Sequence, residues 1–173
     1  MLKEIGMNDQ ALVNELHALG IAFEHVDHPA VFTVDESIGL HDAMPGLHTK
    51  NLFLKDAGGR FWLVTVSAAA RVDLKALPAV IGAKRVSFGK ADDMVALLGV
   101  TPGAVTPLAA INDAGAGVTI VLDRAVAGAA RVNVHPLRNT ATIGLAGADL
   151  VRALEHWRHP PIIVDMPLLS DAT

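Results

Sequence analysis

A lysine at the head of an apolar run is the first residue whose type and position could do chemistry. Lys50 precedes Asn51, Leu52, Phe53 and Leu54 in a segment rich in β-formers. Because side chains alternate along a strand, Lys50 shares a face with Leu52 and Leu54, and Asn51 points the other way with Phe53. If the leucine face packs on the core, an ammonium group stands at the mouth of an apolar pocket, where burial without a partner is costly. The alternative is a strand-end lysine whose head reaches water.

A turn-rich segment further along could bind a ligand through its main chain. Gly103, Ala104, Val105, Thr106 and Pro107 form a run with a glycine and a proline four residues apart. Glycine permits a close backbone approach and proline fixes the loop, so N–H and C=O groups of this run could face a ligand. Glycine and proline also punctuate ordinary loops, so the run by itself does not establish a site.

Polar side chains also gather around an abrupt strand end. Asn133, His135 and Asn139 flank the pair His135-Pro136. Three convergent polar groups could line a pocket, although turn capping explains both asparagines equally well.

Several other chemistries find no support in the sequence. The chain has no cysteine, which excludes disulfides, thiolate metal sites and a cysteine nucleophile. Among its eight histidines, His25 and His28 are three apart in a predicted strand and should point to opposite faces. Neither a phosphate-binding loop, a dinucleotide fingerprint nor a nucleophile elbow is present. We therefore expect neither a metal nor a cofactor.

The formal net charge of −4 argues against a protein that binds long stretches of nucleic acid, because such proteins are usually basic. A local contact to RNA remains compatible with it. Candidate positions are Lys84, Arg85 and Lys90 in one stretch and Arg131 and Arg138 in another. Scattered surface cations are the alternative explanation for each.

The elements that must position these groups follow from periodicity and turn signals. Helices are predicted over residues 9–19, 34–43, 73–81, 91–98 and 147–157. Strands are predicted over 21–26, 50–55, 60–66, 85–88, 118–122, 131–134 and 140–145, with an edge strand at 162–164. The runs 50–55 and 60–66 form a hairpin about a turn with two glycines. This irregular order favours an α/β (α+β) fold: a mixed, mostly antiparallel, barrel-like sheet flanked by helices.

The length and composition fit one compact unit. The chain has 173 residues, 51% apolar and 18% charged, and shows no repeat or long linker. We expect residues 1–173 to form a single domain. The first residues lack a signal-peptide pattern, and no run approaches the ~20 apolar residues of a membrane span, so we expect a soluble, cytoplasmic protein without membrane contact.

Three segments together resemble a known family. Residues 50–56 (KNLFLKD), 99–113 (GVTPGAVTPLAAIND) and 133–145 (NVHPLRNTATIGL) occur in the order and spacing seen in the editing domain of bacterial prolyl-tRNA synthetase and the YbaK family. The resemblance spans roughly residues 7–168. It is closest to the free-standing Ala-tRNA(Pro) deacylases, because of the KNLFLKD run and the sequence Ile111-Asn112-Asp113.

The resemblance implies an editing-domain fold, no metal, and a pocket for the aminoacylated 3′-terminal adenosine. Lys50 matches the essential lysine of the family, and Gly103 with Pro107 matches its Gly-x-x-x-Pro loop. Asn51, His135 and Asn139 fall in family segments close to the pocket.

The implied function is hydrolysis of Ala-tRNA(Pro) by substrate-assisted attack of water on the ester. Such a second sieve has a physical reason, because a pocket shaped for proline cannot exclude the smaller alanine, and each missing methylene is worth only ~1–3 kcal/mol in discrimination. The expected partner is the acceptor end of tRNA(Pro) carrying alanine, with a transient contact to prolyl-tRNA synthetase or elongation factor. The alternatives are a deacylase for another mischarged residue (Cys, Ser or a small non-protein amino acid) and a non-catalytic module that binds aminoacyl-tRNA or a synthetase.

Overall fold

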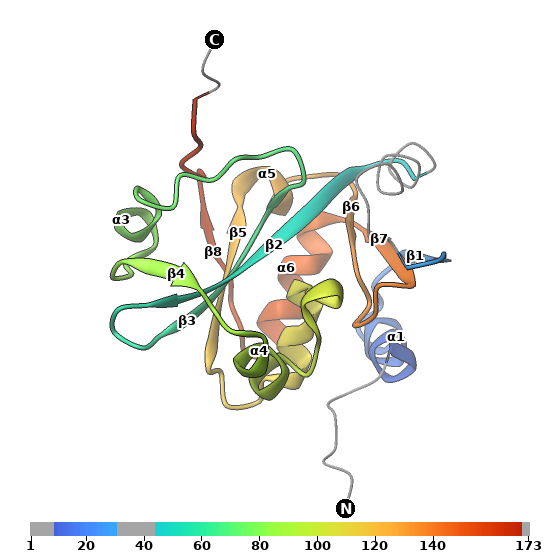
Figure 1. Cartoon of the computed structure of the whole chain (residues 1–173). Helices are drawn as coiled ribbons and strands as arrows, with labels where there is room; N and C mark the ends of the chain where they lie inside the picture. The colour runs from blue at the N-terminus through green and yellow to red at the C-terminus, as the bar shows by residue number, and fades with distance from the viewer. Residues whose placement is uncertain (1–8, 31–43, 171–173) are drawn as a thin grey trace, which may run out of the picture.

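The computed structural model describes residues 9–30 and 44–170 of the chain (Figure 1). Its α-helices are α1 (Asp9–Ala18), α3 (Leu77–Ile81), α4 (Ala91–Leu98), α5 (Arg124–Ala127) and α6 (Gly147–His156), with 3₁₀ helices η1 (Pro102–Ala104) and η2 (Pro107–Asn112). Its strands are β1 (Phe23–Asp27), β2 (Leu47–Asp56), β3 (Phe61–Ser67), β4 (Val86–Phe88), β5 (Val118–Asp123), β6 (Val132–Val134), β7 (Ala141–Leu145) and β8 (Ile162–Val164).

The strands form one mixed sheet in the order β1-β7-β6-β2-β3-β5-β8, with β4 paired to β2 off this path. The pairs β1·β7, β6·β7, β2·β3 and β2·β4 are antiparallel, and β2·β6, β3·β5 and β5·β8 are parallel. The long strand β2 crosses the middle of the molecule and joins the two halves of the sheet (Figure 1). The predicted mixed sheet flanked by helices is confirmed, including the hairpin β2–β3 and the edge strand β8.

Both faces of the central strands are covered by apolar side chains. Phe53 and Leu63 belong to the larger cluster, which packs against α1, α4, η2 and α6. Leu54 and Val64, their neighbours along β2 and β3, belong to a second cluster with α3 and β8. This division follows from the alternation of side chains along each strand. Consecutive residues of β2 therefore face two different environments.

The predicted helix 73–81 is too long, because only Leu77–Ile81 is helical. Proline lacks an N–H and clashes with the preceding turn, so Pro78 is tolerated only in the first turn of a helix. The residues before it form a turn in which the Asp73 carboxylate accepts from the N–H groups of Lys75 and Ala76.

Other boundaries move by a few residues. β2 begins at Leu47 rather than Lys50, because Leu47 and His48 pair with β6, a partner distant in sequence. The short helix α5 and the helices η1 and η2 were not predicted. The predicted helix over 34–43 lies outside the described residues.

Candidate functional site

Strand β2 has a gap on one of its edges. On one side it pairs with β3 from Thr49 to Lys55. On the other side it pairs with β6 at Leu47 and His48, and with β4 from Leu54 to Asp56. Among the described strands, none pairs with this second edge over residues 49–53. The gap is the place where a segment other than a strand can meet the sheet.

The main chain of Asn51 points into this gap. Leu47 N–H donates to Arg131 O at 2.9 Å, and Phe53 O accepts from Gly89 N–H at 2.8 Å, both on the gapped edge. Alternate residues of a strand direct their N–H and C=O groups to the same edge, so Asn51, between these two, does so as well. Asn51 therefore presents one donor and one acceptor of the main chain to the gap.

The side chain of Asn51 ties the predicted loop to the strand. Its Nδ2 donates to Val105 O at 3.1 Å. The Thr65 hydroxyl, fully buried on β3, donates to Asn51 Oδ1 at 2.6 Å. Because the hydroxyl supplies a donor to Oδ1, it fixes which way the amide points. Asn51, Thr65 and Val105 thus form one hydrogen-bonded unit.

Thr65 is a residue of the site that the sequence alone did not identify. Its signal is a single hydroxyl inside the otherwise apolar run Leu63-Val64-Thr65-Val66. A buried hydroxyl needs a partner, and here the partner is Asn51.

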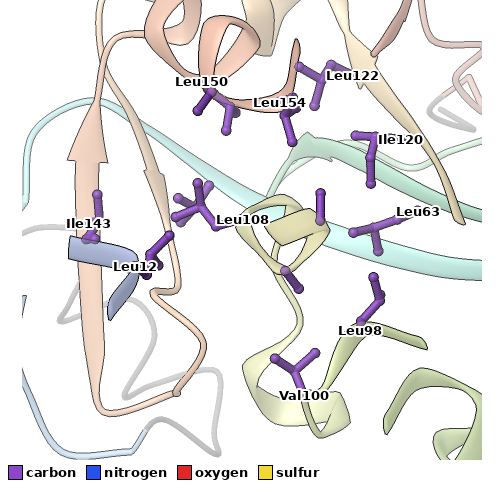
Figure 2. Close-up of a cluster of buried hydrophobic side chains, with 14 of the residues drawn as sticks. Leu12, Leu63, Leu98, Val100, Leu108, Ile120, Leu122, Ile143, Leu150 and Leu154 are labelled. Atoms are coloured by element: carbon purple, nitrogen blue, oxygen red, sulfur yellow. The ribbon is translucent and has the colours of Figure 1, made fainter. Parts of the chain in front are cut away.

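The Gly103–Pro107 loop is held in place by the helix η2, which begins at the last residue of the loop. Thr106 Oγ1 accepts from Leu108 N–H at 3.3 Å and caps η2, and Pro107 occupies its first position. Figure 2 shows Leu108 among buried side chains from other elements, including Leu98 and Leu150. The side chains of Ala104, Thr106 and Pro107 are buried, so these residues offer a ligand mainly their backbone.

Gly103 is exposed and lies against the turn between β6 and β7. A Cβ placed on Gly103 would stand 3.4 Å from Asn139 Nδ2. Two of the predicted segments, the loop 103–107 and the turn 135–139, therefore meet at this point. With Asn51 bonded to Val105, the structure brings Asn51, Gly103, Val105 and Asn139 into one neighbourhood.

His135 is a partly buried imidazole, and one of its ring nitrogens already has a hydrogen-bond partner. Its Nδ1 lies 3.1 Å from Ala141 O, a pure acceptor, so Nδ1 carries a proton. Burial lowers the pKa of His135 below the usual 6.5; the hydrogen bond to Ala141 opposes this, and the nearby His28 lowers the pKa further. At neutral pH the ring is therefore uncharged, and Nε2 is an acceptor.

The turn that carries His135 and Asn139 is held by Arg138. Its guanidinium donates to Asp9 Oδ2 at 2.6 Å and Asp27 Oδ1 at 2.5 Å, and to Thr140 O at 3.0 Å. Arg131 likewise pairs with Glu24. These two arginines, considered above as RNA contacts, are thus engaged within the protein.

The side chain of Lys50 projects from the face of β2 opposite to that of Asn51. It stands directly across from the buried Val66 of β3 and is half-buried. Within residues 9–30 and 44–170, no carboxylate forms an ion pair with its ammonium group. An ammonium beside apolar side chains, without a counter-ion, is suited to an anionic or carbonyl oxygen of a ligand. The hydrogen-bonded unit around Val105 does not include it.

The described residues, 9–30 and 44–170, offer neither a metal-binding cluster nor a membrane-spanning helix. They contain no group of three or more His, Cys, Asp or Glu side chains placed to hold a metal ion. None of their helices is long and apolar enough to cross a membrane.

Comparison with known sequences gives a consistent set of relatives. The sequence model of the aminoacyl-tRNA editing domain matches residues 28–153. The prolyl-tRNA synthetase associated domain-containing protein 1 of Danio rerio is 38% identical over 151 residues, covering 86% of this chain and 82% of that protein. The prolyl-tRNA editing protein ProX of Acetoanaerobium sticklandii is 35% identical over 147 residues, covering 84% of this chain and 90% of that protein.

Solved structures agree at the level of the fold. A crystal structure described as a candidate trans-editing enzyme for prolyl tRNA synthetase superposes with a TM-score of 0.68 at 19% identity. The match covers 96% of this chain and 99% of that chain. At this identity the likeness concerns the arrangement of helices and strands.

Proposed function

Because the chain belongs to the aminoacyl-tRNA editing domain family, we propose that it removes alanine mischarged onto tRNA(Pro) by hydrolysing the aminoacyl ester. Membership of the family confirms the resemblance drawn from residues 50–56, 99–113 and 133–145. A relative named as a prolyl-tRNA editing protein supports the choice of tRNA. The choice of alanine rests on the sequence runs 50–56 and 111–113.

The observation that carries the proposal is the tether between Asn51 and Val105. It ties the Gly103–Pro107 loop to Asn51 of the strand that also carries Lys50, within the stretch 49–53 whose second edge no described strand pairs. Hydrolysis of an activated ester needs a positioned water and stabilisation of the developing oxyanion more than it needs a protein nucleophile. A rigid loop backbone beside a strand gap supplies fixed donors and acceptors for this purpose.

Lys50 is proposed to hold the 3′-terminal nucleotide or the ester carbonyl oxygen. Its ammonium lacks an internal counter-ion among the described residues, so a phosphate or carbonyl oxygen would supply the missing partner. As charge develops on the carbonyl oxygen, the same interaction becomes stronger.

His135 is proposed to accept a hydrogen bond from the substrate. Its Nδ1 proton is committed to Ala141 O, so Nε2 is an acceptor. The α-ammonium group of the aminoacyl moiety is a donor of the complementary kind. Asn139, beside Gly103, would complete the polar rim.

In the reaction, the oxygen of a water molecule attacks the ester carbon and forms a tetrahedral oxyanion. The adjacent ribose hydroxyl assists in removing the proton of the water. Collapse of the intermediate breaks the bond to the ribose oxygen, which takes up that proton, and releases free alanine and tRNA. Proline would be excluded by its larger volume if the site fits only alanine.

Deacylation of Ala-, Cys-, Ser- and Pro-tRNA(Pro), with Ala-tRNA(Ala) beside them, tests the proposal. We expect selective loss of alanine from tRNA(Pro). Lys50→Ala should abolish turnover and leave the thermal midpoint nearly unchanged. Lys55→Ala is the matched control, because Lys55 is an exposed lysine on the same strand that points to the other face.

Each alternative result has a definite meaning. Preference for Cys or Ser would keep the reaction and change the substrate. A wild-type rate in Lys50→Ala would remove the assigned role of the lysine. If none of the esters were hydrolysed faster than in buffer, the protein would be a binding module instead.

A further inference from the structure

The positive charge of this acidic protein is concentrated in one stretch. Residues 50–90 contain eight of the fourteen Lys and Arg residues and only two of the eighteen Asp and Glu residues. Eight cations against two carboxylates give this stretch a formal charge of +6, in a chain whose total is −4. The stretch builds most of β2, together with β3, α3 and β4. The strand that carries Lys50 therefore belongs to the basic part of the molecule.

An exposed aromatic ring stands within this basic stretch. Phe88 of β4 is 65% exposed, the highest value among the large apolar residues that the structure describes as exposed. Two exposed cations flank it in sequence, Arg85 and Lys90. Neither forms an ion pair with a residue in the described ranges 9–30 and 44–170. We call Phe88, Arg85 and Lys90 the Phe88 platform.

The strand register places Phe88 on the same face of the sheet as Lys50. Phe88 pairs with Leu54, and directly paired residues share a face. Lys50 is four residues before Leu54 on β2 and shares that face by the period of two. At about 3.3 Å per residue and about 4.8 Å between strands, the two Cα atoms are roughly 14 Å apart. Figure 1 shows β4 at the rim of the sheet, beside β2.

The position of the ring is fixed by its neighbour in sequence. Gly89 N–H donates to Phe53 O at 2.8 Å. A Cβ on Gly89 would stand 2.4 Å from the Phe53 ring, so only glycine allows the chain to lie this close. β4 therefore ends against the core, with Phe88 held outward.

We propose that the Phe88 platform stacks an unpaired base of the single-stranded 3′ end of the tRNA acceptor, close to the nucleotide held by Lys50. This inference rests on the proposed function. An aromatic face bordered by cations matches a single-stranded nucleic acid, because the base stacks on the ring and the phosphates meet the positive side chains. Asp92 and Asp93, in the first turn of α4, end the basic stretch on that side.

A second copy of the chain fits this surface less well. Among the strands of residues 9–30 and 44–170, β4 pairs only with β2, and none of them covers its outer edge. Pairing two copies there would bring Arg85 and Lys90 of one copy against those of the other. Like charges brought together across an interface are unfavourable.

The test uses the full chain and two RNA hairpins that carry the acceptor stem of tRNA(Pro), one with the unpaired 3′ nucleotides and one blunt. Affinity is measured by fluorescence anisotropy at fixed low salt. We expect the wild type to prefer the hairpin with the 3′ tail. Phe88→Ala should weaken that binding about five-fold or more, the lower end of what base–aromatic stacking contributes, and should leave the blunt hairpin unaffected.

Two matched variants make the result specific. Phe88→Trp retains an aromatic face and should bind the tailed hairpin at least as well as the wild type. Leu168→Ala removes a 53% exposed apolar side chain outside the basic stretch and should change nothing. Lys90→Ala should lower affinity for both hairpins and reduce the salt dependence.

Kinetics separates this inference from the proposed function. In deacylation, Phe88→Ala should raise KM and leave kcat unchanged, because the ring is remote from the ester. An active wild type with an unchanged KM in Phe88→Ala would overturn the platform alone, whereas an inactive wild type would overturn the proposed function. A concentration-dependent dimer that Phe88→Ala abolishes in sedimentation would assign the surface to a second copy.

Discussion

Asn51 and Thr65 are the two side chains of the hydrogen-bonded unit that includes the main-chain carbonyl of Val105. Mutations of these two residues should therefore have coupled effects on the free energy of unfolding. Asn51→Ala removes the bond to Val105 O and the bond from the Thr65 hydroxyl. Each such bond contributes about 0.5–1.5 kcal/mol, and a buried hydroxyl left without a partner costs about 1–3 kcal/mol. Thr65 is fully buried. We therefore expect Asn51→Ala to lower the free energy of unfolding by about 2–4 kcal/mol.

The double variant should lose less free energy of unfolding than the two single variants lose together. Thr65→Val removes the hydroxyl and leaves the bond between Asn51 and Val105 intact, so we expect a loss of about 1 kcal/mol. With both substitutions there is no orphaned hydroxyl in β3. The coupling energy between the two positions should therefore be about 1–2 kcal/mol. Urea denaturation of the four proteins, at constant m-value, measures it.

The same substitutions should separate in the deacylation assay. Asn51→Ala releases the Gly103–Pro107 loop from β2, and a displacement of about 1 Å in a positioning element can cost ~10²-fold in rate. We expect kcat/KM to fall at least ten-fold in Asn51→Ala and to change little in Thr65→Val. Asn112→Ala is the control, because Asn112 Nδ2 also donates to a main-chain carbonyl, that of Leu98, but Asn112 is the last residue of η2 and lies outside the Gly103–Pro107 loop.

Three results would contradict these expectations for Asn51 and Thr65. Strictly additive losses in stability would show that Asn51 and Thr65 do not act as a unit. An unchanged kcat/KM in Asn51→Ala would show that the tether of the loop is irrelevant to turnover. If Asn112→Ala lowered kcat/KM as much as Asn51→Ala, the effect would reflect general loosening of the loop.

Three further outcomes are expected. Gly103→Ala places a methyl group in ordinary contact with Asn139 Nδ2, at 3.4 Å, so the thermal midpoint should be nearly unchanged while deacylation slows; loss of fold would contradict this. His159→Ala breaks a buried contact in which Nε2 lies 3.0 Å from Asp113 Oδ2, and should destabilise the protein by about 3 kcal/mol in urea denaturation without changing kcat/KM at low temperature. The lowered pKa of His135 means that the unfolded chain binds its proton more readily than the folded one, so stability should fall as pH drops through about 6.5. His135→Gln should remove that part of the pH dependence, and an unaltered stability profile would refute the assignment.

Much of the fold follows from local signals in the sequence. The hairpin β2–β3 is marked by two β-rich runs and a turn with two glycines, and α1, α4 and α6 by apolar periodicity with clear ends. Errors occur where a local signal competes with a stronger rule or with a distant partner. The helix predicted over 73–81 is shorter in the structure because Pro78 must lie in its first turn. Strand β2 is longer than predicted and begins at Leu47, because it pairs with β6.

The candidate site was only partly accessible to sequence reasoning. Residue types identified Lys50, the Gly103–Pro107 loop and the polar turn with His135 and Asn139, and the resemblance to a family gave them a common purpose. Period-two alternation also gave the opposite directions of Lys50 and Asn51, which the pairing of β2 with β3 bears out. These are properties of neighbouring residues along the chain.

Only the tertiary structure decided how those segments meet. The bond from Asn51 to Val105 spans 54 positions, and the approach of Gly103 to Asn139 joins two separate loops. The partner of Thr65, the ion pairs of Arg138 and the placement of Phe88 on the face of Lys50 depend likewise on strand order and register. A sequence fixes which groups are available and how they alternate locally, but contacts between distant segments depend on the packing of the whole sheet against its two apolar clusters.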